Sequence, residues 1–242
     1  MMELCDDQIH FWFTRLGQND PRISTLHSFL SVDEIKRAER FHFDRDRVSY
    51  TISHGVLRQL IAQYVGVAPR DVEYVNGPHG KPSLAPVCGD TSLQFNMSHT
   101  AGLAVYAFGR NRRIGVDVEH IDREIKDRDA IAEGYFSKQE VEVYRALPEI
   151  DKVTGFFNCW TRKESYLKAR GDGLSTSLDS FQVTLRPGDP ARLVFAKQDR
   201  ATAWSMASLE PAEGYVTAIS AESNWNLIDL GEFHSELDFS RA

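Results

Sequence analysis

The amino-acid sequence predicts an α+β fold, in which helices and strands are grouped apart along the chain. Two long stretches have apolar residues at helical spacing, and short strand-like runs follow each, so helix and then strands occur once in each half. With 242 residues, 42% of them hydrophobic and 26% charged, the chain can bury a core and is too apolar to be disordered. This length corresponds to one large domain or two small ones.

The first half opens with an apolar and aromatic run, Gln8 to Leu16, which predicts a strand. Ser31 and Glu34 have the spacing of a capping box and predict the start of a helix. A longer helix is predicted over Asp46 to Val65, because apolar residues recur there every three or four positions. Its polar face carries Arg47, Thr51, His54 and Arg58.

Short strand-like runs separated by Gly and Pro turns follow this helix and predict a meander. They are Val72 to Val75, Leu93 to Met97 and Leu103 to Phe108.

The second half begins with Ile114 to Glu119, a run of alternating apolar residues that predicts a strand. Two helices are predicted next, over Ser137 to Leu147 and Asp151 to Ala169, and Gly171 and Gly173 close the second. Strand-like runs finish the chain: Phe181 to Leu185, Leu193 to Lys197, Trp204 to Leu209 and Tyr215 to Ser220.

Charge and cysteine use argue against several classes of function. The chain has 28 Lys and Arg against 35 Asp and Glu, a net charge of −7, which is the wrong sign for a nucleic-acid partner. Three cysteines without CxxC spacing argue against a disulfide framework or a structural zinc site and fit the reducing cytoplasm. We expect neither a secretion signal nor a membrane span, because the N-terminus is acidic and no window approaches about 18 apolar residues. The common motifs of NTPases, serine hydrolases and dehydrogenases are absent.

Two carboxylates share one face of the strand predicted at 114–119. Asp117 and Glu119 stand two positions apart, which places them about 6.6 Å apart along a strand. Like charges at this spacing repel unless a cation or solvent separates them, and a hard cation such as Mg²⁺ suits carboxylate ligands. The alternative is a half-exposed strand with a solvated acidic face.

The helix predicted at 151–169 directs a third carboxylate inward. Glu164 follows Trp160 by four residues, where the apolar stripe would place another apolar residue. An unpaired buried carboxylate is costly, so a metal or a cationic partner is expected. Lys168 lies one turn further on, and the alternative is an ordinary Glu–Lys helix pair. Together with Asp117 and Glu119, these groups make the constellation of a Mg²⁺-dependent phosphoryl-transfer site.

Two other segments could add phosphate contacts. Asn96-Met-Ser-His99 ends a predicted strand, and Gly80-Lys-Pro82 stands in a turn. The alternatives are a surface or capped histidine and an ordinary turn.

Taken in order, five segments resemble the motif series of the 4′-phosphopantetheinyl transferases of the Sfp type, over roughly residues 31 to 185. They are Gly80-Lys-Pro82, Phe95-Asn-Met-Ser-His99, Ile114-Gly-Val-Asp-Val-Glu119, Phe136-Ser-Lys-Gln-Glu140 and Trp160-Thr-Arg-Lys-Glu-Ser-Tyr-Leu-Lys168. The resemblance implies transfer of the phosphopantetheine arm of coenzyme A to a serine of an apo acyl or peptidyl carrier protein, with release of adenosine 3′,5′-bisphosphate.

The resemblance also implies roles for the matching residues. Asp117, Glu119 and Glu164 would ligate Mg²⁺, and Lys168 would steady or protonate the departing bisphosphate. Glu164 would be the base toward the carrier serine, directly or through a water. Glu140 is a second candidate for the base, although Ser137 and Glu140 also fit a capping box. Coenzyme A would be held by Arg47, Gly80, Lys81, Pro82, Asn96, Ser98, His99, Asp117 and Lys168.

The fold that the resemblance implies has two similar α+β halves packed side by side as a pseudo-dimer, with coenzyme A in the cleft. Residues 1–110 would form the half on the side of the coenzyme A 3′-phosphate, and residues 111–242 the half with Mg²⁺ and the catalytic residues. The length matches the long, single-chain form of the family, so a monomer is expected. One departure concerns the segment Asp46-Arg-Val-Ser-Tyr50, which keeps a first arginine, Arg47, and has Ser49 where many relatives have a second.

Two other functions compete with this transferase. A Mg²⁺-dependent nuclease also combines carboxylates and a lysine, but it places the lysine two residues after the carboxylate on a strand, whereas Lys168 follows Glu164 by four on a helix. A non-catalytic module that binds a carrier protein or a nucleotide is the third possibility. The presence of all three carboxylates together with Lys168 argues against such an inactive site.

Overall fold

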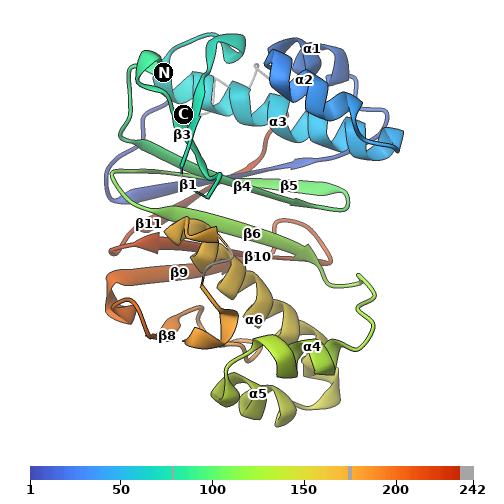
Figure 1. Ribbon diagram of the computed structural model, residues 1–242, viewed down its shortest axis with the longest axis vertical. Coiled ribbons are helices and arrows are strands. Elements are labelled where there is room, and N and C mark those ends of the chain that lie inside the picture. The colour runs from blue at the N-terminus through green and yellow to red at the C-terminus, as the bar shows by residue number, and fades with distance from the viewer. Residues whose placement is uncertain (78, 174–175, 235–242) are drawn as a thin grey trace.

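A computed structural model describes residues 1–77, 79–173 and 176–234, and it confirms the α+β fold (Figure 1). Each half of the chain contributes one main sheet and one long helix of 22 residues. In the described part of the chain, no helix is both long and apolar enough to span a membrane.

The first half is built on a four-stranded sheet of order β11-β1-β5-β4. These strands are Asn226–Glu232, Gln8–Arg15, Leu103–Arg110 and Leu93–Thr100; β11 is parallel to β1, and the other neighbours are antiparallel. Its helices are α1 (Ile23–Phe29), α2 (Val32–Glu39) and α3 (Asp44–Val65). The short strands β2 (Tyr74–Asn76) and β3 (Pro82–Leu84) pair only with each other, so the predicted meander is wrong in part: only β4 and β5 continue into one sheet.

The second half is built on a three-stranded antiparallel sheet of order β6-β10-β9. These strands are Ile114–His120, Tyr215–Glu222 and Trp204–Leu209. Its helices are α4 (Arg128–Tyr135), α5 (Lys138–Arg145) and α6 (Glu149–Arg170), and a ribbon pairs β7 (Phe181–Val183) with β8 (Leu193–Ala196). Short 3₁₀ turns lie at Pro69–Asp71, Pro86–Cys88, Leu178–Ser180 and Ala201–Ala203.

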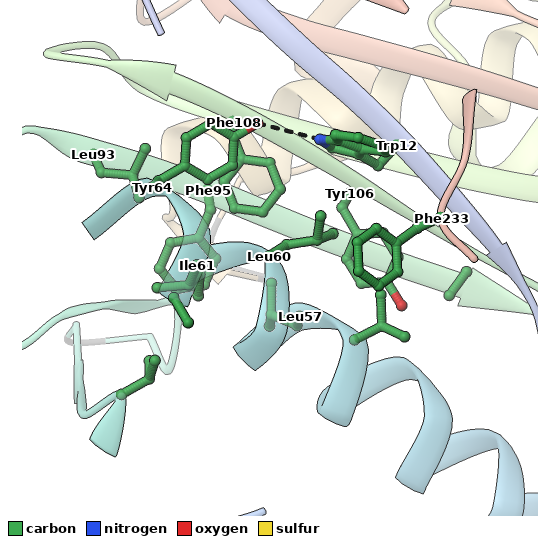
Figure 2. Packing of buried hydrophobic residues seen from close by; sticks show 14 of the residues in the cluster. Trp12, Leu57, Leu60, Ile61, Tyr64, Leu93, Phe95, Tyr106, Phe108 and Phe233 are labelled. Atoms are coloured by element: carbon green, nitrogen blue, oxygen red, sulfur yellow. Dashed lines mark hydrogen bonds between the residues drawn. The ribbon is translucent and has the colours of Figure 1, made fainter. Parts of the chain in front are cut away.

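The elements form layers, with the helices of each half outside and the two sheets facing each other between them (Figure 1). The four-stranded sheet is therefore buried on both faces, which explains why β5 is apolar almost throughout. Leu103 and Val105 of β5 face the other sheet, whereas Tyr106 and Phe108 lie under α3. Figure 2 shows the α3 side of this core, where Leu57, Leu60, Ile61 and Tyr64 of the helix meet Phe95, Tyr106 and Phe108 of the strands.

The two halves repeat one packing device, a capping box whose glutamate pairs with a buried cation of the long helix. In the first half Ser31 and Glu34 form the box at α2, and Glu34 pairs with Arg58 of α3 at 2.6 Å. In the second half Ser137 and Glu140 form the box at α5, and Glu140 pairs with Lys163 of α6 at 2.7 Å. We call these the capping-box ion pairs.

Each cation of these pairs also donates to backbone carbonyls beyond its helix. Arg58 donates to Pro69 and Val72, and Lys163 donates to Leu178 and Phe181. Both cations occupy the fifteenth position of their helices. The two halves are therefore alike in side-chain packing as well as in element order, as the pseudo-dimer prediction requires.

The same register shows that the halves differ in chemistry. The positions of α6 held by Glu164 and Lys168 correspond in α3 to Gln59 and Gln63. Amides replace both charged groups, so this part of the first half has no counterpart of the charged site described below.

Helix α6 lies unusually close to β6 at Gly115. A Cβ atom on Gly115 would overlap the carbonyl oxygen of Ser165 and the amide nitrogen of Ala169. The hydroxyl groups of Ser165 and Ser220 hydrogen-bond at 2.6 Å in the same layer. Small residues on α6, β6 and β10 therefore let the helix rest directly on the sheet.

Most predicted elements are confirmed, with ends that differ by a few residues. The helix predicted at 46–65 is α3, the helix predicted at 151–169 is α6, and both capping boxes form. Four elements have no counterpart among those predicted from the sequence: α1, α4, β3 and β11. The domain boundary at residues 110 and 111 stays a prediction, but β11 lies beyond it in sequence and completes the sheet of the first half.

Candidate active site

The centre of the site is a contact between three elements at the junction of the two halves. Lys168 of α6 donates to Asp117 of β6 at 2.6 Å and to the Ser98 hydroxyl of β4 at 2.8 Å. Ser98 in turn donates to the same Asp117 oxygen at 3.0 Å. The structure therefore brings together three residues that the sequence analysis had assigned to coenzyme A and metal binding.

The carboxylates of β6 are buried, so the alternative of a solvated acidic face is wrong. Asp117 is 6% exposed and Glu119 is 9% exposed. Burial and the nearby Asp117 raise the pKa of Glu119 to about 6, although Arg123, 2.9 Å away, opposes this shift. Burial and Asp117 also raise the pKa of Glu164, against the opposing effect of Lys168. The three carboxylates thus repel one another in a space with little water, where a cation would be stabilised.

The donor set fits a hard divalent cation. In the ranges that the structure describes, no three His, Cys, Asp or Glu side chains are gathered closely enough to hold a metal ion. However, the second carboxylate oxygen of Asp117 is buried without a hydrogen-bond partner, while Lys168 occupies the first. An unpaired buried carboxylate oxygen is costly and is an available metal ligand, and oxygen-only ligands favour Mg²⁺.

Two adjoining pockets form a cleft beside this centre. The smaller, about 290 Å³, is lined by the Gly80 turn, the end of α6 and β4: His79, Gly80, Lys81, Pro82, Asn96, Met97, Glu164, Leu167, Lys168, Gly171 and Gly173. The larger, about 570 Å³, shares Gly80, Pro82, Asn96 and Met97 with it and extends under α2 and α3. A ligand longer than either pocket could therefore lie across both, with one end beside Glu164 and Lys168.

The far end of the larger pocket is lined by two basic side chains that were not predicted as site residues. Arg37 and His54 both line it, and among the described residues Arg37 forms no ion pair. His54 stacks on Tyr50 and lies 3.5 Å from Glu34. No local motif marked these residues; the only signal was the position of His54 on the polar face of α3, which proves to border the cleft.

Arg47 lies apart from this cleft. Its side chain is 48% exposed, pairs with Asp44 at 3.0 Å and lines neither pocket. The predicted polar face of α3 is thus divided: Arg47 faces solvent, whereas Thr51 and Arg58 are buried. The structure does not support Arg47 as a coenzyme A contact.

Among the described residues, the contacts of Glu140 are with groups other than Asp117, Glu119 and Glu164. It is 3% exposed, caps α5, pairs with Lys163 and accepts a hydrogen bond from the Val183 amide at 2.7 Å. A carboxylate committed to these partners holds secondary structure together. The structural alternative for Glu140 is therefore favoured over a role as base.

The remaining predicted residues lie along the junction. Asn96 accepts a hydrogen bond from the Val116 amide at 2.8 Å and so joins β4 to β6. His99 has exposed surface at the end of β4, and its pKa is lowered by restricted hydration and by the nearby His54 and Lys168. Gly80 and Pro82 line both pockets through the turn. Lys81 lines the smaller pocket, but its ammonium group donates to backbone carbonyls of the second half.

Comparisons with known proteins identify the two halves with one family. A family model described as 4′-phosphopantetheinyl transferase, N-terminal, matches residues 19–110, and one described as the 4′-phosphopantetheinyl transferase superfamily matches residues 113–220. The chain is similar to the 4′-phosphopantetheinyl transferase HetI of Nostoc sp., with 36% identity over 219 residues, 90% of each chain. It is 29% identical to the 4′-phosphopantetheinyl transferase Sfp of Bacillus subtilis over 161 residues, 65% of this chain and 67% of Sfp.

A solved structure gives a more distant likeness. The holo-[acyl-carrier-protein] synthase of Thermotoga maritima aligns with a TM-score of 0.35 and 17% identity, over 46% of this chain and 62% of that one. This likeness is too weak to define the fold. The extent and identity of the sequence matches are sufficient: the chain belongs to the 4′-phosphopantetheinyl transferase family.

Proposed function

We propose that this chain transfers the 4′-phosphopantetheine group of coenzyme A to a serine of an apo acyl or peptidyl carrier protein, releasing adenosine 3′,5′-bisphosphate. The observation that carries the proposal is that Lys168 pairs with Asp117 beside a cleft that Glu164 and Lys168 line, with Glu119 on the same strand as Asp117, in a chain of this family. A transfer from a pyrophosphate requires neutralised phosphate charge and a proton acceptor for the attacking hydroxyl, and these residues supply both.

Each charged residue has a distinct part in this chemistry. The serine oxygen attacks the phosphorus next to the pantetheine arm, the bond to the bridging oxygen breaks, and the bisphosphate leaves with that oxygen. Glu164 accepts the serine proton, directly or through a water, since it lines the cleft one turn from Lys168. Lys168 stabilises or protonates the departing phosphate. Asp117, Glu119 and Glu164 would hold Mg²⁺, which when bound neutralises pyrophosphate charge.

The 3′-phosphate of coenzyme A would lie at the far end of the larger pocket, against Arg37 and His54. Arg37 would then provide the positive charge that a second arginine would provide at the position of Ser49. His99 would lie near the same 3′-phosphate, because His99 is close to His54. A charge-assisted hydrogen bond to phosphate contributes about 1.5–3 kcal/mol, or roughly 10- to 150-fold in affinity.

This placement is tested with coenzyme A and dephospho-coenzyme A, which lacks the 3′-phosphate. Arg37→Ala is expected to weaken coenzyme A at least about tenfold and to leave dephospho-coenzyme A within about twofold. Arg47→Ala is the matched control and should change neither ligand. A selective loss for Arg47→Ala, with none for Arg37→Ala, would return the 3′-phosphate to Arg47.

The carrier protein would approach beside Glu164 over an apolar surface. Tyr135 is exposed and contacts Trp160, which stands one turn before Glu164 on α6. We propose that the chain acts as a monomer in the cytoplasm, with no nucleic-acid or membrane partner, in keeping with its charge and cysteine use.

The decisive experiment is incubation with coenzyme A, Mg²⁺ and a panel of apo carrier proteins, followed by intact mass measurement. One member at least is expected to gain one phosphopantetheine group, and none should do so in EDTA. Binding of a carrier without any mass gain across the panel would support the non-catalytic module. Cleavage of DNA or RNA with no transfer would support the nuclease.

A further inference from the structure

Lys81 was expected to contact coenzyme A, but its ammonium group has other partners. It donates to the carbonyl oxygen of Ile114 at 2.7 Å and to that of Ala169 at 3.0 Å. Among the described residues, no carboxylate lies within ion-pair distance of Lys81. Two of the three protons of the ammonium are therefore committed to backbone groups.

These two carbonyls belong to the elements that carry the whole charged site. Ile114 is the first residue of β6, three positions before Asp117, and Ala169 is in the last turn of α6, one position after Lys168. Carbonyls in the last turn of a helix lack partners within the helix and carry partial negative charge, so a cation is stabilised there. One side chain thus fixes the start of the metal-ligand strand against the end of the catalytic helix.

The backbone of Lys81 is held by the first half. Lys81 precedes β3, and its carbonyl accepts a hydrogen bond from the Gly77 amide across the turn. The β2–β3 ribbon is anchored through Tyr74, whose ring packs on Phe95 and under the guanidinium of Arg58. The ribbon therefore links the packed core of the first half to the charged site of the second.

The surroundings of Lys81 fit this link. Its stem packs on Gly171, the left-handed residue that ends α6, where a Cβ atom would lie 3.3 Å from the Lys81 Cδ. Burial, with the nearby Arg113, lowers the pKa of Lys81 to about 8. Glu222 opposes this shift, but its carboxylate pairs with Arg113. Neutral carbonyls are thus the direct partners of a buried ammonium group.

We propose that Lys81 is a positioning residue: through Ile114 and Ala169 it holds Asp117 and Glu119 in register with Glu164 and Lys168, and its ammonium group does not bind the phosphates of coenzyme A. The inference rests on the proposed transfer, because the alignment of these four residues matters for catalysis of that reaction. A displacement of about 1 Å between reacting groups can lower a rate about 100-fold.

The experiment compares Lys81→Met, which keeps the stem and removes the donors, with Lys81→Arg, which keeps charge and donors. Lys197→Met, at an exposed lysine, is the matched control. Lys81→Met is expected to lower kcat at least about tenfold and to change the KM for coenzyme A less than about threefold. Lys81→Arg should recover most of kcat, and Lys197→Met should match the parent.

Amide hydrogen exchange provides a second readout that does not depend on activity. In Lys81→Met, exchange is expected to become faster at residues 114–117 and 166–171, with no change in Lys197→Met. Unchanged kcat or unchanged exchange at these two segments would overturn the positioning role. A KM rise of 10-fold or more with kcat retained would show a phosphate ligand instead. If the parent protein transfers nothing, the proposed function fails, and the exchange comparison still decides whether Lys81 holds the two segments.

Discussion

The environment of each glutamate decides what it can do in this protein. Glu140 and Glu164 stand on neighbouring helices of the second half, but Glu140 is paired with Lys163 and two backbone amides, whereas Glu164 lines the cleft. The pKa of Glu164 is raised by burial and by Asp117. A carboxylate without committed partners can exchange protons or ligate a cation, and one with three strong partners stabilises structure.

The carboxylates of the cleft are expected to act as one unit. Asp117→Ala and Glu164→Ala should each lower the rate of transfer at least about 100-fold, because positioning and charge neutralisation supply most of the catalysis of phosphoryl transfer. Both variants should remain folded by circular dichroism, and Glu213→Ala, at an exposed glutamate, is the control. Transfer is measured by intact mass with Mg²⁺ and with EDTA; near-normal turnover in EDTA would contradict a metal-dependent unit.

A second prediction at this scale concerns His10, which is buried under α3. Its Nδ1 lies 2.9 Å from the Tyr64 hydroxyl, and burial lowers its pKa from 6.5 to about 4. His10 therefore binds a proton more tightly in the unfolded chain than in the folded protein. The free energy of unfolding is at its full value above pH 6.5 and falls as the pH decreases from 6.5 to 4, by up to about 3 kcal/mol.

The test compares urea unfolding of the parent and His10→Gln from pH 7 to pH 4. The parent is expected to lose more stability than the variant over this range. Equal slopes would mean that His10 does not titrate in the predicted window.

At the scale of elements, the site depends on how closely α6 approaches β6 and on how α6 is held against its other neighbours. Gly115 allows backbone contact between the helix and the strand, and Lys163 joins α6 to α5 through Glu140 and to the carbonyl groups of Leu178 and Phe181. Because β6 carries Asp117 and α6 carries Lys168, changes in this packing alter the distance between catalytic groups.

Gly115→Ala is expected to destabilise the protein by about 3 kcal/mol or more, because the new methyl group overlaps backbone atoms of α6 that cannot rotate away. Gly134→Ala is the matched control: it lies in α4 with no heavy atom within 4 Å of the added Cβ, and it should change stability by no more than about 1 kcal/mol. Thermal unfolding monitored by circular dichroism measures both, and equal melting temperatures would contradict the close approach.

Glu140→Gln separates the structural role of this residue from catalysis. Breaking a buried ion pair is expected to cost about 3 kcal/mol or more, since Lys163 is left charged at 1% exposure. Turnover per folded molecule should stay within a few-fold of the parent, in contrast to Glu164→Gln. A stable Glu140→Gln protein with turnover reduced 100-fold would make Glu140 the base.

At the scale of the whole molecule, the two similar halves contribute differently to the site, because Asp117, Glu119, Glu164 and Lys168 all come from the second half. Gln59 and Gln63 of α3 stand where α6 has Glu164 and Lys168, while the first half supplies Asn96, Ser98 and His99 from β4. The cleft therefore needs both halves. Strand β11, which follows β10 of the second half, pairs with β1 and so joins the halves a second time.

Carrier binding is expected to depend weakly on salt. The enzyme has a net charge of −7, and carrier proteins are generally acidic, so long-range attraction is not available and apolar contacts beside Trp160 must supply affinity. KM for the carrier, measured from 50 to about 500 mM NaCl, should change less than about threefold. Tyr135→Ser should raise it more than salt does. A steep loss of affinity with salt would indicate a concentrated basic patch.

The amino-acid sequence alone determined the α+β class, both long helices, both capping boxes and the family resemblance. These follow from local periodicity, cap chemistry and ordered motifs, which do not need contacts between distant residues. It also predicted one site for Asp117, Glu119, Glu164 and Lys168, because a family's motifs carry its tertiary arrangement with them. What local patterns could not give was the partner of each charge.

Only the tertiary structure decided which of the predicted side chains are free to act. Lys81 and Glu140 have the residue types of a phosphate ligand and a base, but both are held by partners that lie distant in sequence: Ile114 and Ala169 for the lysine, Lys163 for the glutamate. Arg37 and His54 carry no motif and reach the cleft because α2 and α3 cover it. The physical reason is that the energy of a charge depends on its burial and partners, and long-range packing sets both.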